Sequence, residues 1–239
     1  MKELIKLDKD WIPTGEGYSL YIRPTVVATH PFLGLTPPSS LILYVILCPV
    51  GPYYTKSYFK PVKLTTDTPY VRAWPGGTGN HKVGGNYAGT IKALAQAKGF
   101  DQVLWLASDR DEITEVGSMN IFFVLEHDEK TMELVTPPLD RGDILPGVTR
   151  DSILEVAKTW EDVIVSERSI TMTELKSANL LEAFGAGTAA VVVPICSIQH
   201  NGKNMEIPAT GPLTKRVWDA VTGIQYGRIE GPEGWSVKI

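Results

Sequence analysis

The chain has few cysteines, no long hydrophobic run and no excess of basic residues, and each shortage excludes a class of protein. Its 239 residues contain 2 cysteines, Cys48 and Cys196, which lie far apart in apolar runs. We therefore expect reduced, buried thiols rather than a disulfide framework or a zinc site. The longest apolar run, Leu41–Val50, is far too short to cross a bilayer, so no membrane is expected. A formal net charge of -4 argues against a nucleic-acid partner.

Other signals are also missing. The 4 histidines show no metal-ligand spacing, so the sequence predicts no metal site. Residues 1–11 are amphipathic with mixed charge and have neither the apolar core of a signal peptide nor the composition of a transit peptide. They resemble the interior of a domain, and we expect that the start of that domain is absent. Hydrophobic residues make up 43% of the chain, which is ordinary for a folded globular protein.

The chain is predicted to form two lobes. A short helix is expected over residues 2–8, a strand interrupted by Pro24 over 19–29, and a strand buried on both faces over 41–49. Residues 51–60 are rich in proline, glycine and tyrosine and are predicted to connect the lobes. The first lobe would then comprise residues 1–50 and the second residues 61–239.

Strands predominate in the middle of the second lobe, and helices are expected on both sides of them. A helix with Ile91, Leu94 and Ala95 on one face is expected after the glycine-rich segment 72–89, followed by a strand at 102–107 and a hairpin of 121–125 with 132–135. Two further helices are expected, one carrying Ile153, Leu154 and Ala157 and one capped by Thr171 and Glu174. The chain then continues with a loop and buried strand over 186–193, an Asn-Gly turn at 200–203, and a terminal helix carrying Leu213, Val217, Val221 and Ile224.

Lys82 is the first candidate for chemistry because it lies among glycines rather than on a solvated helix face. A lysine held in this way can face a ligand, lose hydration and react as an amine, as Schiff-base chemistry requires. The residues alone favour an exposed loop lysine. A nucleotide-binding P-loop is excluded, because His81 and Val83 occupy the positions that need glycine and a hydroxyl residue.

Other residues could assist such a lysine. Glu115 stands at the entry to an apolar strand, where a carboxylate would either pair with a cationic ring nitrogen or satisfy backbone amides at a turn. Residues 147–149 open a helix whose free amides suit phosphate, and residues 185–189 form a second small-residue loop. The remaining candidates are cationic or aromatic residues that could hold an anion or a ring oxygen, or lie on the surface: Tyr21, Arg23, Tyr53, Arg72 and Tyr87.

Eight segments in a fixed order resemble the branched-chain amino acid aminotransferases, which are pyridoxal-phosphate enzymes of the fold-type IV class. The resemblance runs from Asp8 almost to Tyr226. The segments are SLYIRP (19–24), LCPVGPYY (47–54), RAWPGGTGNHKVGGNYAG (72–89), QVLWL (102–106), TEVGSMN (114–120), TPPLDRGDILPGVTR (136–150), FGAGTA (184–189) and IQYG (224–227). It implies an α/β (α+β) fold with a remnant of a small α/β lobe in residues 1–50 and a large lobe with a β-rich, barrel-like core and flanking helices.

The resemblance implies a role for each candidate. Lys82 corresponds to the lysine that binds pyridoxal 5'-phosphate and then carries the proton between Cα and C4′ as catalytic acid and base. Glu115 corresponds to the carboxylate at the pyridine nitrogen, and Tyr87 to the tyrosine at the ring oxygen. Phosphate would be held by Arg72, by the amides of Val148 and Thr149, and by the Thr188 loop. The substrate would be bound by Tyr21, Arg23 and Tyr53 and by the backbone of Thr188 and Ala189.

The implied reaction is reversible amino transfer from leucine, isoleucine or valine to 2-oxoglutarate, in a homodimer located in the cytoplasm or in mitochondria. Two alternatives remain open. The chain could be truncated and inactive, acting at most as a cofactor-binding or dimer-forming partner, because family members have a longer N-terminal part. Related fold-type IV enzymes that act on D-amino acids or cleave aminodeoxychorismate are the other alternative.

Overall fold

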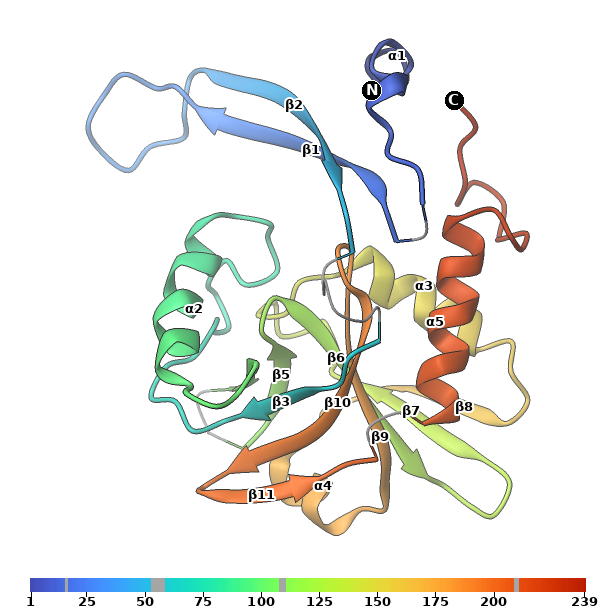
Figure 1. The fold of residues 1–239 in the computed structure, drawn as a ribbon. Helices are drawn as coiled ribbons and strands as arrows, with labels where there is room; N and C mark the ends of the chain where they lie inside the picture. The colour runs from blue at the N-terminus through green and yellow to red at the C-terminus, as the bar shows by residue number, and fades with distance from the viewer. Residues whose placement is uncertain (16, 53–58, 108–110, 209–210) are drawn as a thin grey trace. The chain divides into compact units, whose positions relative to one another are not determined.

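The computed structural model describes residues 1–15, 17–52, 59–107, 111–208 and 211–239. Tyr53 therefore lies outside the described residues. The chain divides into two compact units, which are residues 1–58 together with 237–239, and residues 59–236. Figure 1 shows the helices and strands of both units.

The first unit contains a long β-hairpin preceded by short helical segments. Its elements are α1 (Lys2–Leu7), the 3-10 helix η1 (Lys9–Trp11), β1 (Ser19–Ala28) and β2 (Leu41–Val50). The two strands pair antiparallel along their whole length, and Pro24 lies opposite Val45 within an uninterrupted ladder. The expected interruption at Pro24 is therefore wrong. A strand with a partner on one side only tolerates proline wherever its nitrogen faces away from that partner.

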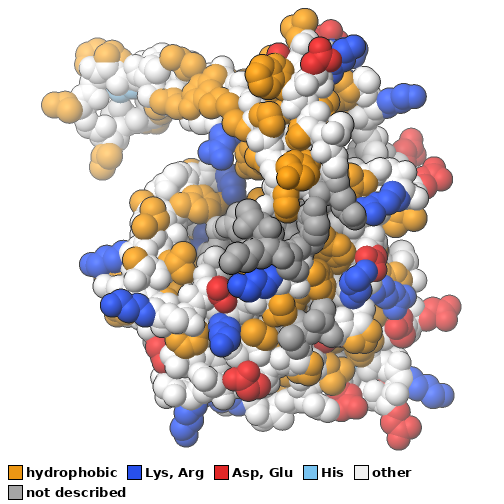
Figure 2. All heavy atoms as spheres, viewed as in Figure 1, with side chains coloured by type: hydrophobic (Ala, Val, Ile, Leu, Met, Phe, Trp, Pro, Cys, Tyr) orange, Lys and Arg blue, Asp and Glu red, His pale blue; other side chains and the backbone are white. Residues whose placement is uncertain are grey.

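The expected burial of the second strand on both faces is also wrong. Most side chains of β2 are exposed, and Leu43 retains 68% of its accessible surface. Cys48 on this strand is also exposed and Cys196 is half-buried, so the expectation that both thiols are buried is wrong. Among the described residues β1 is the only strand that pairs with β2, and a two-stranded ribbon does not cover either of its own faces. Figure 2 shows the resulting band of hydrophobic side chains along the hairpin.

The second unit is built on a closed ring of strands. Its strands are β3 (Val62–Thr65), β4 (Gln102–Leu106), β5 (Ile113–Val116), β6 (Met119–Glu126), β7 (Met132–Thr136), β8 (Val163–Glu167), β9 (Leu180–Gly187), β10 (Val191–His200) and β11 (Lys203–Glu206). Neighbouring strands follow the order β10, β3, β4, β5, β6 and β9, and β9 pairs again with β10. Strand β11 extends the sheet beyond β10, and β7 and β8 extend it beyond β6. This closure confirms the expected barrel-like core.

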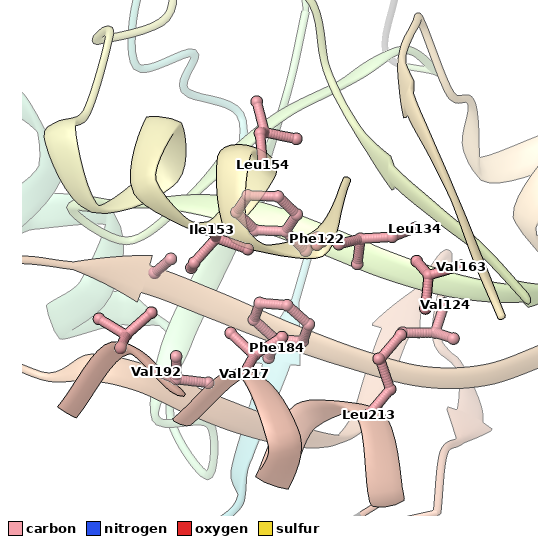
Figure 3. Packing of buried hydrophobic residues seen from close by; sticks show 13 residues of the cluster. Phe122, Val124, Leu134, Ile153, Leu154, Val163, Phe184, Val192, Leu213 and Val217 are labelled. Carbon is pink, nitrogen blue, oxygen red and sulfur yellow. The ribbon is translucent and has the colours of Figure 1, made fainter. Parts of the chain in front are cut away.

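Helices flank the ring. They are α2 (Gly85–Gln96), α3 (Val148–Ala157), α4 (Met172–Ser177) and α5 (Pro212–Gln225). Helices α3 and α5 contact each other, and both contact β9. Between them lies a buried cluster in which the rings of Phe122 and Phe184 stack with centroids 5.0 Å apart (Figure 3). The apolar residues expected to dock the two helices are all buried: Ile153, Leu154, Ala157, Leu213, Val217, Val221 and Ile224.

Local sequence signals fix several ends of elements. The Thr171 hydroxyl accepts a hydrogen bond from the Glu174 amide at 3.0 Å, which confirms the cap of α4. Asn201 and Gly202 adopt positive φ angles of 54° and 71° between β10 and β11, as the expected Asn-Gly hairpin turn requires. In α2, by contrast, the expected apolar face is not the buried one, because Ile91 is 70% exposed and Ala93 is the buried residue of this helix.

Within the described part of the chain, no helix combines the length and the hydropathy that a membrane span requires. The same residues contain no group of three or more His, Cys, Asp or Glu side chains that could hold a metal ion.

Candidate active site

Glu115 is a buried carboxylate at the centre of the candidate site. It lies on β5 opposite Trp105 of β4 and Asn120 of β6, and 3% of the residue is exposed. One oxygen, Oε1, accepts hydrogen bonds from the Leu145 amide at 3.0 Å and from the Asn120 side chain at 3.4 Å. The other oxygen, Oε2, lies 2.5 Å from Nε of Arg72. Strand pairing and a loop amide thus hold the carboxylate in one orientation.

The environment of Glu115 changes its protonation. Burial raises the pKa of this carboxyl from 4.5 to about 7, because a charged carboxylate loses hydration inside the protein. The positive charge of Arg72 and the Leu145 amide lower the pKa in part, and Lys82 also lowers it. The negative charge of Asp143 raises it further. The influence of Lys82 places the amine within electrostatic range of this carboxylate.

Arg72 faces Glu115 and two backbone carbonyls. Its side chain is 5% exposed, and Nη2 donates to the carbonyl oxygens of Gly79 at 3.1 Å and Asp143 at 2.5 Å. Its Nε has no directed hydrogen-bond partner among the described residues, so its contact with Glu115 is a close ion pair rather than an aligned hydrogen bond. The expected contact of Arg72 with a phosphate stays a prediction.

The glycine-rich segment packs tightly against Asp143. A Cβ at Gly79 would lie 2.5 Å from the Asp143 carbonyl oxygen and 2.5 Å from the Cβ of Ala73. Both atoms belong to groups that cannot move easily, so glycine is the residue that fits there. This close approach also brings the Gly79 carbonyl to Arg72.

Lys82 and Tyr87 form the second half of the site. The amine Nζ donates to the Tyr87 hydroxyl at 2.8 Å and lies 4.9 Å from the centre of its ring. Tyr87 is in the first turn of α2, while Lys82 is an exposed residue of the segment that precedes this helix. The amine is therefore accessible to a small molecule and already hydrogen-bonded to a phenol.

Asn86 fixes the loop that carries Lys82. Its side-chain amide donates to the carbonyl oxygens of Thr78 at 2.7 Å and His81 at 2.8 Å, and its oxygen accepts from the Thr78 hydroxyl at 2.7 Å. Asn86 is not among the residues that the sequence pattern predicted for the site. An asparagine next to a candidate tyrosine in a glycine-rich loop is the signal that was available, because asparagine side chains bond readily to nearby backbone.

Two groups of backbone amides lie at turns of the second unit. Helix α3 begins after Gly147, and its first amides, which include those of Val148 and Thr149, have no acceptor within the helix. Thr188 and Ala189 are exposed in the turn that joins β9 to β10. Val191 follows this turn with a φ of 57°, a conformation that is costly for a β-branched residue. The turn is therefore held by its surroundings rather than by local preference.

The substrate residues expected from the first lobe fall outside residues 59–236. Tyr21 and Arg23 lie on β1, where the Arg23 guanidinium is 5.3 Å from the centre of the Tyr21 ring. The described structure brings Lys82 to Tyr87 and Arg72 to Glu115, all within residues 59–236. A contribution of Tyr21, Arg23 and Tyr53 to the same site stays a prediction.

Asp143 and Asn120 are further polar residues of the site that the sequence analysis did not select. Asp143 is 1% exposed and accepts a hydrogen bond from Arg141 at 2.9 Å. Asn120 is 5% exposed and donates to the Leu145 carbonyl at 2.9 Å. A buried polar side chain is costly unless it is satisfied, so an asparagine inside an apolar strand was a usable signal.

The donor set suits a ligand that combines an aldehyde, a basic aromatic ring and a phosphate. An accessible amine next to a phenol can condense with an aldehyde, a buried carboxylate can face a protonated ring nitrogen, and first-turn amides of α3 suit a phosphate. The residues present therefore fit pyridoxal phosphate.

Comparison with known proteins identifies relatives of the whole chain. The family model for amino-transferase class IV matches residues 1–198. The branched-chain-amino-acid aminotransferase of Dictyostelium discoideum is 52% identical over 100% of this chain and 65% of its own length. The mitochondrial enzyme of Rattus norvegicus is 47% identical over 100% of this chain and 62% of its own length. This chain thus spans less than two thirds of either relative.

Solved structures agree with the sequence comparison. The branched-chain amino acid aminotransferase of Escherichia coli is 29% identical and aligns with a TM-score of 0.76 over 91% of this chain and 69% of its own. The T.th. enzyme, solved with N-(5'-phosphopyridoxyl)-L-glutamate, is 26% identical and aligns with a TM-score of 0.75 over 98% and 71%. The expected fold-type IV class is confirmed, and the chain belongs to the class IV aminotransferase family.

Proposed function

We propose that this chain carries out pyridoxal-phosphate-dependent amino transfer between a branched-chain L-amino acid and 2-oxoglutarate. The observation that carries the proposal is the accessible Lys82 amine, hydrogen-bonded to Tyr87 and within electrostatic range of the buried Glu115. The names of the relatives, which are branched-chain-amino-acid aminotransferases at 52% and 47% identity, support this substrate class.

The residues of the second unit would hold the cofactor at four points. Lys82 would bind its aldehyde, Tyr87 its phenolic oxygen and Glu115 its ring nitrogen. The amides of Val148 and Thr149 and the Thr188 loop would hold its phosphate, together with Arg72 if that side chain leaves its present partners. When bound, pyridoxal phosphate supplies an aldehyde for amine exchange and a ring that accepts electrons from the substrate Cα.

The chain's own groups would provide the proton transfers. Once released from the cofactor, the Lys82 Nζ holds a lone pair that can take a proton from the substrate Cα and deliver it to C4′. The Tyr87 hydroxyl, 2.8 Å away, orients that amine and shares its hydrogen bond. Glu115 would hold a proton at the ring nitrogen by its negative charge.

The remaining expectations belong to the same proposal. Tyr21 and Arg23 from the first lobe (residues 1–50) and Tyr53 from the connection (51–60) would bind the substrate, and Thr188 and Ala189 of the large lobe (61–239) would receive the substrate carboxylate. The partners would be small amino and oxo acids and a second copy of the chain. Relatives include cytosolic and mitochondrial enzymes, so either compartment fits this chain.

Covalent trapping tests the role of Lys82. The protein is incubated with pyridoxal phosphate, reduced with borohydride, digested, and analysed by peptide mass. We expect the label on Lys82 in the wild type and its loss in Lys82→Ala. Lys92→Ala is the matched control, because Lys92 also lies near a tyrosine ring, 5.4 Å from the centre of Tyr70. Equal labelling of Lys82 and Lys92 would contradict a specific site.

Donor preference tests the reaction. The loaded protein should convert L-leucine, L-isoleucine and L-valine in the presence of 2-oxoglutarate, and D-alanine should be a much poorer donor. A preference for D-alanine would assign the chain to another fold-type IV activity. A folded, loaded protein without transfer from any donor would support the inactive alternative.

A further inference from the structure

We propose that Asn120 is a positioning residue that holds the Glu115 carboxylate and the N-terminus of α3 in one fixed arrangement, an inference that rests on the proposed function. In that function Glu115 meets the ring nitrogen and the first turn of α3 meets the phosphate, so the two must stay a set distance apart. Asn120 contacts both the Glu115 carboxylate and the segment that leads into α3.

The side-chain amide of Asn120 bridges two acceptors. Nδ2 donates to the Leu145 carbonyl at 2.9 Å and, with a longer contact of 3.4 Å, to Oε1 of Glu115. The Leu145 amide donates to the same Oε1 at 3.0 Å. Asn120, Glu115 and Leu145 thus form a closed triangle of hydrogen bonds, and only 5% of Asn120 is exposed. Burial excludes competing water and makes these bonds electrostatically stronger than they would be in water.

The other end of the Asn120 side chain lies against the start of α3. A Cβ at Gly147, the N-cap residue of α3, would lie 2.2 Å from Oδ1 of Asn120. Only a residue without a side chain allows this approach. The segment from Leu145 to Gly147 is therefore hydrogen-bonded to Asn120 at the Leu145 carbonyl and packed closely against it at Gly147.

The backbone of Asn120 connects the same point to two strands. Asn120 pairs with Glu115 of β5 on one side and with Ala186 of β9 on the other. Strand β9 ends at Gly187, directly before the Thr188 turn. One residue therefore joins the carboxylate, the helix start and the strand that leads to the second expected phosphate loop.

The chemistry of the bridge requires an amide. Both acceptors are oxygens, and a primary amide supplies two N–H donors from one atom. Aspartate has the same shape but would place a second carboxylate against Glu115, and an apolar residue would leave the Leu145 carbonyl unsatisfied. The charged groups that act on Glu115 are Arg72, Lys82 and Asp143.

The test measures the pH dependence of the free energy of unfolding, without added cofactor, for the wild type, Asn120→Ala and Asn120→Asp, each with and without Glu115→Gln. The contribution of Glu115 to this pH dependence is the difference between each protein and the same protein with Glu115→Gln. Its midpoint should lie about one pH unit higher in both Asn120 variants than in the wild type, because the ionised carboxylate loses a hydrogen-bond donor. Asn120→Ser replaces the alanine variant if the latter does not fold.

Thr136→Val is the matched control. Thr136 is 1% exposed and its hydroxyl donates to the Ile121 carbonyl at 2.7 Å, so the variant also loses one buried hydrogen bond near β6. It should reduce stability equally at all pH values and leave the Glu115-dependent midpoint unchanged. A folded Asn120 variant whose midpoint equals that of the wild type would overturn the proposal.

A second readout measures pyridoxal phosphate binding by tryptophan fluorescence. Asn120→Ala should bind about tenfold more weakly than Thr136→Val, because a Glu115 carboxylate without this donor is no longer held in the orientation that the ring nitrogen would require. Equal affinities of the two variants would count against the positioning role. Failure of the wild type to bind would refute the proposed function instead, and the pH measurement would still decide whether Asn120 acts on Glu115.

Discussion

The hairpin of the first unit and the ring of the second unit use similar strands with opposite results. Strand β2 and strand β6 are both nearly continuous apolar runs, yet Leu43 of β2 is 68% exposed and Phe122 of β6 is fully buried. Strand β6 pairs on both edges and is covered by helices, whereas β2 pairs only with β1 among the described residues. An apolar run therefore predicts a strand, and its neighbours determine whether it is buried.

The largest expected effect sharpens this comparison directly. Phe122→Ala should lower the free energy of unfolding of the second unit by about 3–5 kcal/mol, because it removes a ring stacked on Phe184 and leaves a cavity. Urea denaturation followed by tryptophan fluorescence measures this change. A loss below about 1 kcal/mol would mean that the cluster between α3 and α5 does not stabilise the unit as described.

The second prediction concerns a charge inside the ring unit. Because the folded pKa of Glu115 is raised to about 7 from 4.5, its stabilising contribution is complete below pH 4.5 and is lost as the pH rises through 7. Relative to Glu115→Gln, the wild type should lose on the order of 3 kcal/mol of unfolding free energy between pH 4 and pH 8. Denaturation curves over this range measure the difference.

Glu133 provides a control of opposite sign. Hydrogen bonds from Arg168 hold the pKa of Glu133 below 4.5. Its contribution is therefore present above the unfolded pKa and is lost as the pH falls through the folded value. Relative to Glu133→Gln, the wild type should thus become less stable at acid pH. The same pH trend in both comparisons would contradict the assignment of opposite shifts.

The third prediction concerns the attachment of α5 to the ring. Glu182 of β9 is 3% exposed and accepts hydrogen bonds from the amides of Leu213 at 3.0 Å and Thr214 at 2.7 Å in the first turn of α5. Glu182→Gln should cost about 2 kcal/mol, since an amide cannot accept all of these bonds. Thermal unfolding measures it, and an unchanged midpoint would show that this cap contributes little.

The smallest effect is expected on the hairpin. Leu43→Ala should change the free energy of unfolding by less than about 0.5 kcal/mol in the chain described here, because the side chain is already 68% exposed. The same denaturation assay measures it beside Phe122→Ala. A loss comparable to that of Phe122→Ala would break the comparison and show that another surface covers β2.

The sequence predicted well those features that depend on neighbouring residues. Thr171 caps α4 through a residue three positions later, and Asn201 with Gly202 forms the turn that such a pair prefers. Helix α5 follows the spacing of Leu213 and Val217. In each case the interaction lies within a few residues of its signal. The prediction that β2 is buried failed because burial depends on strands and helices that are distant in the sequence.

The candidate site divides in the same way. Lys82 and Tyr87 are five residues apart, so one segment places both, and the glycines around them indicated a ligand. The contact of Arg72 with Glu115 joins residues brought together by the ring, and the sequence alone offers no periodicity that reveals it. Asn120 meets Leu145 for the same reason. Roles that depend on such contacts required the structure.

The most direct test of the account is a single half-reaction. Protein loaded with pyridoxal phosphate and freed of excess cofactor is mixed with L-leucine in the absence of 2-oxoglutarate, and the 2-oxo acid released is quantified. The proposed function predicts about one oxo acid per loaded chain in the wild type and none in Lys82→Ala, with Lys92→Ala equal to the wild type. A folded, loaded wild-type protein that releases no oxo acid would contradict it.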